Sequence, residues 1–236
     1  MANQSVLSAD EFREYVLKNA TQQKYIKMLG TANTNWQDEI YQAAWGTDNN
    51  ISLSGGIKKL PYRLSLGYTD QNGIVKTNEF RRTSFGLSLT SKFFDNHLSV
   101  NANIKGSMTE NRFNDKDVVR AAQQFDPTQS VYDYTTKGNN VNNYWEWYLP
   151  DALGNFTNAM NVNGTLNPVG MLYGKRDVST VFRAIAGLQL DYKLHFLPDL
   201  HFNVNVGYDS QKGNGAVTQY PTYGGVVRSG DISSRR

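Results

Sequence analysis

The sequence predicts an all-β protein: an antiparallel meander that forms part of a transmembrane β-barrel wall, preceded by a short N-terminal helix. Three observations predict this fold. Apolar and polar residues alternate in six segments, and this period of two is typical of strands that bury one face. The links between the segments are alternately short and long. The second face carries mainly Ser, Thr, Asn and Gly with scattered charges, which fits a hydrated barrel lumen.

The N-terminal segment has the pattern of one helix near residues 9–29. Ser8 and Glu11 have the spacing of a capping box, and Phe12, Tyr15 and Val16 fall near one stripe. Gly30 is placed where a helix would stop. We expect this helix to pack on a neighbouring part of the protein.

Six strands are predicted, near residues 51–58, 61–70, 80–92, 97–108, 178–196 and 199–212. Aromatic residues collect near the strand ends, as they do in the interfacial girdles of membrane barrels: Tyr62, Tyr68, Phe93, Phe94, Tyr192, Phe196 and Tyr208. The apolar side chains between the ends are predicted to face lipid: Leu64, Leu66, Leu87, Leu89, Val100, Leu188, Leu190, Val204 and Val206.

The lengths of the links predict which ends of the strands lie together. The short turns at 58–61, 93–97 and 196–199 should lie at one end, and the segments 70–79 and 109–177 at the other. Outer-membrane barrels have short periplasmic turns and long extracellular loops. The predicted parts are therefore an N-terminal helix and loop (1–50), barrel strands (51–108), a long extracellular loop (109–177), barrel strands (178–212) and a loop or tail (213–236).

The composition excludes several classes of protein. The chain has 236 residues, a net charge of +3 and no cysteine, so disulfides, zinc–thiolate sites and thiol catalysis are excluded. The small charge does not indicate a nucleic-acid partner. No apolar run approaches the length of a membrane-spanning helix, but the mean hydropathy of −0.56 is compatible with strands that alternate between lipid and lumen. No signal peptide is recognisable at the N-terminus.

The sequence shows no catalytic or cofactor motif. The three histidines have no companion at a metal-ligand or catalytic-triad spacing, and no nucleotide-binding glycine pattern occurs. We therefore expect no enzyme activity, metal or cofactor. The stretch "NNYWEWYLPD" in the long loop offers a candidate ligand surface in Tyr144, Trp145, Trp147 and Tyr148, next to two acidic residues. Packing of the loop on itself is the competing interpretation, and aromatic rings are more often used in that way.

Several spaced motifs resemble the SusC/RagA family of TonB-dependent outer-membrane transporters. They are a "W-x-D-E-I" segment at Trp36–Ile40, "SGG" at Ser54–Gly56, "GY-x-x-Q-x-G" at Gly67–Gly73 and "F-x-R" at Phe80–Arg82. The stretches "FDPTQSVYD", "NPVGML" and "DYKLHFLPDLHFNVNVGYD" extend the resemblance to residues 10–212.

The resemblance implies a plugged barrel of 22 strands that imports glycans or peptides with energy from TonB, capped by a SusD-like surface lipoprotein. No TonB box or plug is recognisable, and six to eight strands are too few for such a barrel. We therefore expect an incomplete, open sheet that is a segment of the barrel wall and contacts the lipid bilayer. Two alternatives stay open: a soluble all-β carbohydrate-binding module, whose apolar faces would pair into a sandwich, and a small complete barrel of about eight strands.

Overall fold

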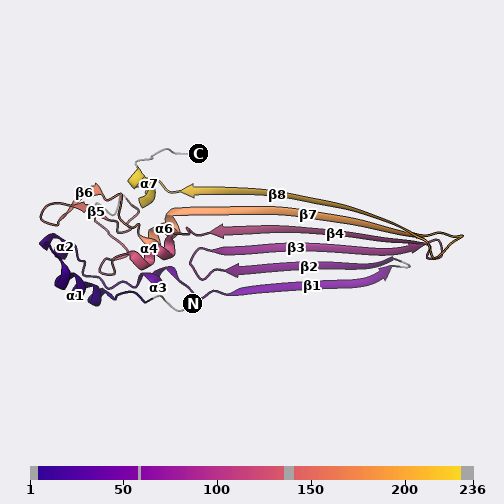
Figure 1. Ribbon diagram of the computed structural model, residues 1–236, viewed down its shortest axis with the longest axis horizontal. Coiled ribbons are helices and arrows are strands. Elements are labelled where there is room, and N and C mark those ends of the chain that lie inside the picture. The colour runs from indigo at the N-terminus through magenta and orange to yellow at the C-terminus, as the bar shows by residue number, and fades with distance from the viewer. Residues whose placement is uncertain (1–4, 58–59, 136–140, 230–236) are drawn as a thin grey trace.

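The computed structural model describes residues 5–57, 60–135 and 141–229, which form a long sheet and a compact cap at one end of it (Figure 1). The strands run side by side along the long axis of the molecule, and the helices gather where the strands end. We call residues 5–45, 114–135, 141–174 and 220–229 the cap. The described part of the chain therefore has two regions of different build.

The sheet is an open antiparallel meander in which each strand pairs with its neighbours in the order β1-β2-β3-β4-β7-β8. This confirms the predicted fold class. Within the described residues β1 and β8 are edges, so the sheet does not close into a small barrel. The strands are β1 (Gly46–Ile57), β2 (Leu60–Asn72), β3 (Glu79–Phe93), β4 (Leu98–Phe113), β7 (Lys175–Lys193) and β8 (His201–Gln219).

The predicted strand boundaries were wrong at the long-loop end. β1 begins at Gly46 instead of residue 51, β4 continues to Phe113, and β7 begins at Lys175. β8 continues to Gln219, through residues that were predicted to be loop or tail. Backbone pairing needs no alternation of apolar side chains, and the β7–β8 register runs unbroken through the polar and glycine-rich stretch up to Lys175↔Gln219. The apolar pattern therefore marked only part of each strand.

The ends of the strands alternate as predicted. The links β3–β4 and β7–β8 lie at the far end of the sheet from the cap, together with the end of β1 and the start of β2 (Figure 1). Of the predicted turn at 58–61, residues 58–59 lie outside the described residues. In the β3–β4 link, Phe94, Asp95 and Asn96 all have positive φ, of 54°, 51° and 71°. Such a tight reversal suits Asp and Asn better than Phe.

The prediction of one N-terminal helix was wrong. The segment forms α1 (Ala9–Asn19) and a shorter α2 (Gln23–Lys27), separated by Ala20 in an extended conformation. The Asn19 side-chain amide donates to the carbonyl of Tyr15 at 2.7 Å and so occupies a backbone acceptor at the end of α1. The predicted capping box is present, because Ser8 and Glu11 each bond the other's backbone amide.

Gly30 does not stop a helix, since α2 ends at Lys27. Its role is a close approach between two distant segments. The Gly30 amide donates to the Thr128 hydroxyl at 2.8 Å, and a Cβ at Gly30 would lie 2.1 Å from the Thr128 carbonyl oxygen. The neighbouring Ala32 amide bonds the same carbonyl at 3.0 Å. The N-terminal segment is thereby held against the long loop.

The hydrophobic core of the described residues lies in the cap. The short elements that surround it are α3 (Trp36–Ile40), α4 (Val118–Gln124), β5 (Tyr148–Pro150), β6 (Phe156–Met160), α6 (Pro168–Gly174) and α7 (Gly224–Ser229). The core consists of Trp36, Ile40, Val118, Ala121, Ala122, Phe125, Val169, Met171, Leu172 and Tyr223. By contrast, strand residues such as Ile51 and Phe202 are 72% and 68% exposed.

Across the described ranges, no helix combines the length and the apolar character needed to cross a membrane.

Candidate functional site

The strand register divides the sheet into two faces. Residues paired across neighbouring strands share a face, and the chains of pairs Leu64↔Leu87, Leu87↔Ile104 and Ile104↔Ala186 join four strands. The same register places all nine predicted lipid-facing residues on one face, which we call the apolar face: Leu64, Leu66, Leu87, Leu89, Val100, Leu188, Leu190, Val204 and Val206.

A broad band of the apolar face is free of charge. It extends from the row of Phe93, Leu98, Tyr192 and Phe202 to the row of Leu66, Phe85, Gly106, Ala184 and Ser210. Among the residues that the structure describes, no Asp, Glu, Lys or Arg lies on this face between the two rows. Among the described residues no second sheet packs against it, because β5 and β6 form a separate two-stranded sheet. The band therefore has the chemistry of a surface in contact with lipid.

Charged residues begin on the same face just beyond the band, on the side of the cap. Arg81 lies 3.6 Å from Asp70 and 3.6 Å from Glu79, and Arg112 lies 3.9 Å from Glu79. Tyr68 and Phe85 stand next to these ion pairs along β2 and β3. An aromatic edge followed by charges is the order of side chains expected where a strand leaves a membrane.

The opposite face, here called the polar face, carries charges over the same length of strand. They include one strong pair, in which the Arg183 Nε and Nη2 donate to the two carboxylate oxygens of Asp209 at 3.0 and 2.5 Å. His201 contacts Asp191 at 2.9 Å. The charged residues that the strand register places on this face are Asp48, Arg63, Arg82, Lys92, Lys105, Lys175, Asp177, Arg183, Asp191, Lys193 and Asp209. Such a face fits water and not lipid.

The two tryptophans of the predicted ligand cluster lie in an aromatic cluster inside the cap. The rings of Trp145 and Trp147 meet edge to face at 4.8 Å. Both rings also contact Phe125, at 5.8 and 6.2 Å, and Phe156, at 5.8 and 6.0 Å. Edge-to-face contacts of this kind stabilise packed aromatic cores. The two tryptophans are half-buried, and each contacts three other rings of the cap.

The segment that carries these rings is held from both sides by buried polar groups. Glu146 is buried and accepts a hydrogen bond from the Asn167 amide at 3.2 Å. The Asn167 side chain accepts from the amides of Val169 and Gly170 at the start of α6, and its Nδ2 donates to the carbonyls of Val131 and Trp145 at 3.0 Å. One buried side chain therefore joins three stretches of the long loop.

The two predicted tyrosines are placed differently from each other. Tyr148 is buried, and its pKa is raised, first by burial and then by the charges of Asp133 and Glu146. Tyr144 is half-buried and stacks on Tyr132 at 5.5 Å. Burial, followed by the proximity of Tyr132 and Tyr173, raises the pKa of Tyr144 to about 12.

The open aromatic surface of the cap belongs to residues that the sequence did not single out. Tyr132 stacks on Tyr134 at 6.0 Å, and the two side chains are 46% and 77% exposed. With Tyr144 they form a row of three tyrosine rings. Two tyrosines at spacing i, i+2 in "VYDYT" were the available signal, but ten residues separate Tyr134 from Tyr144 and only the fold brings them together.

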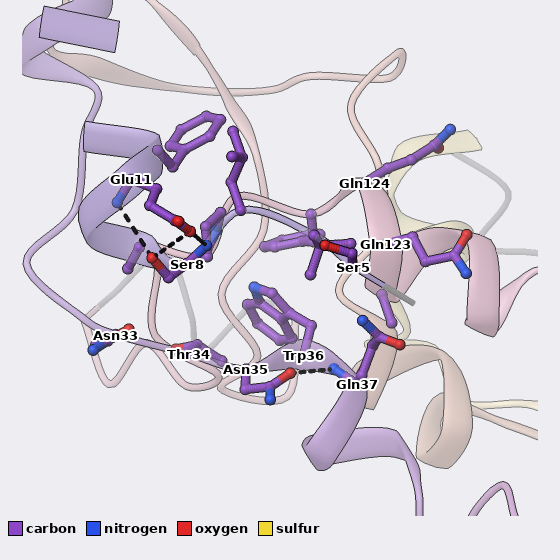
Figure 2. Close-up of a pocket in the computed structure, with 17 residues that line it drawn as sticks. Ser5, Ser8, Glu11, Asn33, Thr34, Asn35, Trp36, Gln37, Gln123 and Gln124 are labelled. Atoms are coloured by element: carbon purple, nitrogen blue, oxygen red, sulfur yellow. Dashed lines mark hydrogen bonds between the residues drawn. The ribbon is translucent and has the colours of Figure 1, made fainter. Parts of the chain in front are cut away.

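A cavity of about 710 Å³ opens between the start of α1, α3 and α4. Figure 2 shows Trp36 between the Ser8–Glu11 capping box and the amides Gln123 and Gln124 of α4. The Trp36 Nε1 is already used, since it donates to the Asp126 carbonyl at 2.9 Å. Hydrogen bonds from Ser8 hold the pKa of Glu11 below its ordinary value. The sequence did not predict this cavity because its walls come from segments far apart in the chain.

The histidines come together at the short-turn end without forming a metal centre. The rings of His97 and His195 are stacked at 4.0 Å, whereas His201 contacts Asp191. Across residues 5–57, 60–135 and 141–229, no three His, Asp or Glu side chains are arranged to hold a metal ion.

The sequence is similar to those of two TonB-dependent receptors. The chain is 38% identical over 239 residues to the TonB-dependent receptor SusC of Bacteroides thetaiotaomicron, a match that covers 91% of the chain and 24% of SusC. The chain is a segment of a SusC/RagA-type TonB-dependent receptor of the outer membrane. It is also 29% identical over 137 residues to the TonB-dependent receptor P3 of Formosa agariphila, across 54% of the chain and 13% of that receptor.

Solved structures share the fold of this chain. The RagAB peptide importer in its closed-closed state matches the present chain with a TM-score of 0.66 at 17% identity. The match covers 93% of the present chain and 27% of the importer chain. The open-open state of the same importer gives a TM-score of 0.59. No family model matches the chain. The chain spans about a quarter of the length of SusC and of the RagAB chain, and its sheet is a stretch of barrel wall.

Proposed function

We propose that this chain forms part of the barrel wall and one extracellular cap of a TonB-dependent nutrient importer. The charge-free band on the apolar face carries the proposal, because a wall that separates lipid from an aqueous lumen needs one face without charges and one face with them. The apolar face would meet the bilayer, and the polar face would line the lumen.

The partners and substrate of the proposed importer are inferred from the family resemblance. The RagAB structures are described as a peptide importer, and SusC as a TonB-dependent receptor. We infer that the whole protein imports a glycan or peptide, takes energy from TonB and is capped by a SusD-like lipoprotein. The cap supports this inference, since it lies at the end of the sheet opposite the short turns, where extracellular loops lie in outer-membrane barrels.

Charge insertion at two neighbouring residues tests the proposal. Leu188 lies on the apolar face, whereas Gln189 lies on the polar face of the same strand. In lipid vesicles, Leu188→Arg should lower the free energy of unfolding by about 2–4 kcal/mol, because the guanidinium is moved into the bilayer. Gln189→Arg should cost far less, because its side chain reaches water. Urea titration of both variants measures the difference, and equal costs would contradict the proposed orientation.

The ligand role predicted for Tyr144, Trp145, Trp147 and Tyr148 stays a proposal in a modified form. The ring contacts of Trp145 and Trp147 favour a packing role for the tryptophans. The exposed row of Tyr132, Tyr134 and Tyr144 is better suited to stack on a sugar ring or an apolar side chain. Tyr134→Ala in the full-length transporter should weaken substrate binding without weakening the cap, and unchanged binding would contradict a ligand role for this row.

A further inference from the structure

The polar face contains a recess whose walls are cationic. The recess has a volume of about 260 Å³ and lies over the middle of β2, β3, β4 and β7. Arg82, Lys105 and Arg183 line it, together with the hydroxyl-bearing residues Ser65, Ser84 and Ser107. The floor is open because Gly86 lies beside Ser65 and Lys105 in the register and carries no side chain. Hydroxyl donors therefore stand among three positive charges.

Two of the three cations lack a carboxylate partner within the described ranges. Arg183 is neutralised by its two hydrogen bonds to Asp209. The ion pairs in the described part of the chain include neither Arg82 nor Lys105. Arg63 lies on the same face next to Ser65 and adds a further positive charge. Among the described residues, these four cations outnumber the two carboxylates nearby on this face, Asp209 on Arg183 and Asp48 in the row of Arg82, so the charge around the recess is net positive.

The neighbouring Arg81, unlike Arg82, has acidic partners within the sheet. Arg81 precedes Arg82 in β3 and points to the opposite face, where Asp70 and Glu79 lie at 3.6 Å. Within the described residues Arg82 forms no ion pair, and Asp48, in the same row, lies two strands away. Of these two consecutive arginines, Arg81 thus forms ion pairs on the apolar face, whereas Arg82 forms none on the polar face within the described residues.

We propose that the recess binds an oxyanion group, a carboxylate or sulfate, of a solute in the lumen. A guanidinium offers a fork of N–H donors that fits two oxygens of such a group, an ammonium adds a point charge, and serine hydroxyls donate further hydrogen bonds. The placement in the lumen rests on the proposed barrel orientation. The binding of an anion by the recess is independent of that orientation.

The experiment uses the chain folded in detergent micelles, with inorganic sulfate and glucuronate as probes and glucose as the uncharged counterpart of glucuronate. Isothermal titration should show binding of sulfate and glucuronate that weakens as sodium chloride is added, and no binding of glucose at the same concentrations. Arg82→Gln and Lys105→Gln should each weaken sulfate binding by roughly fivefold, since each removes a charged donor. Arg82→Lys should keep part of the affinity.

Two matched variants separate the recess from general charge effects. Arg81→Gln removes a guanidinium from the other face of β3, and Lys92→Gln removes a cation from the polar face of the same strand outside the recess. Both should leave sulfate binding within about twofold of the original value. Equal losses in Arg81→Gln and Arg82→Gln would overturn the proposal, and so would the absence of sulfate and glucuronate binding by the unmodified chain.

Two further results separate this proposal from its alternatives. If the chain binds sulfate but the full-length transporter does not, an acidic side chain elsewhere in that protein fills the recess, and the solute proposal is overturned. If Leu188→Arg and Gln189→Arg cost the same while Arg82→Gln still weakens anion binding, the barrel orientation fails and the anion site stands. Circular dichroism of each variant confirms that the strands have formed.

Discussion

The sheet and the cap bury their apolar residues in opposite ways. In the cap, Trp36, Ile40 and Leu172 are at most 3% exposed, and they pack on residues from α3, α4 and α6. In the sheet, apolar side chains such as Ile104 and Val206 are 50% and 59% exposed. The cap carries its own core, whereas the sheet needs lipid to cover one face. The comparison teaches that one chain can combine a region that folds around its own core with a region whose apolar face is left for lipid.

The largest effect is expected from removing the two tryptophan rings of the cap. Replacing Trp145 and Trp147 together by Ala should lower the free energy of unfolding of the cap by about 4 kcal/mol, because both rings pack on Phe125 and Phe156. Hydrogen exchange should show faster exchange in α4 and α6 and unchanged exchange in β4 and β7. Loss of substrate uptake by a cap of undiminished stability would instead assign the two rings to ligand binding.

A single core substitution should show the same difference between regions. Ile40→Ala in the cap should cost about 3 kcal/mol, since the side chain is fully buried. Leu190→Ala on the apolar face should cost less than about 1.5 kcal/mol, because lipid tails fill the space that a rigid protein core would leave empty. Urea titrations in lipid vesicles compare the two variants. A larger cost for Leu190→Ala would mean that a protein core, and not lipid, covers that face.

Asn167 is expected to matter by an intermediate amount. Asn167→Ala removes the cap of α6 and leaves the carbonyls of Val131 and Trp145 without their donor, so it should cost about 2 kcal/mol. Asn155→Ala serves as a comparison on the cap surface, where the one lost side-chain hydrogen bond, to Asp151, is exposed and the expected cost is far smaller. Thermal unfolding monitored by tryptophan fluorescence measures both, and equal costs would refute the central role of Asn167.

The smallest expected effect is a loss of cap stability at alkaline pH. The pKa of Tyr144 is about 12 in the folded cap and near 10 in an unfolded chain, so the folded state holds this proton more tightly. The contribution to stability is present below pH 10 and is lost as the pH rises toward 12. Because Tyr144 is only half-buried, we expect it to amount to about 1 kcal/mol.

A variant of the same shape tests this assignment. Tyr144→Phe should remove part of the decline in stability between pH 10 and 12, whereas Tyr134→Phe, on the exposed ring of the same row, should not change it. Absorbance titration of the phenolates gives an independent measurement. A steep decline that is unchanged in Tyr144→Phe would assign it to other groups.

The sheet was predictable from the sequence, whereas most of the cap was not. Alternation placed Leu64, Leu188 and Val204 on one face, because a period of two follows from strand geometry alone. It missed the ends of β4 and β8, where pairing continues without apolar residues. The broken N-terminal helix was missed because a local extended residue, Ala20, interrupts a pattern that is helical on both sides.

The candidate sites show the same limit. The stretch around Trp145 was recognised as unusual, but whether its rings face ligand or core depends on Phe125 and Phe156, which the sequence places far from one another. The cavity beside Trp36 and the recess beside Arg82 each join residues from several segments. For the recess, the register of four strands had to be known before Arg82, Lys105 and Arg183 could be assigned to one place.

The central claim is that the apolar face meets lipid and the polar face meets water, and spin-label accessibility tests it most directly. The chain has no cysteine, so single cysteines at Leu188 and Gln189 can be labelled without background. In lipid vesicles, a nitroxide at position 188 should be relaxed by oxygen and shielded from a water-soluble nickel chelate, and a nitroxide at position 189 should show the reverse. A label at position 188 that is fully accessible to the nickel chelate would contradict the account.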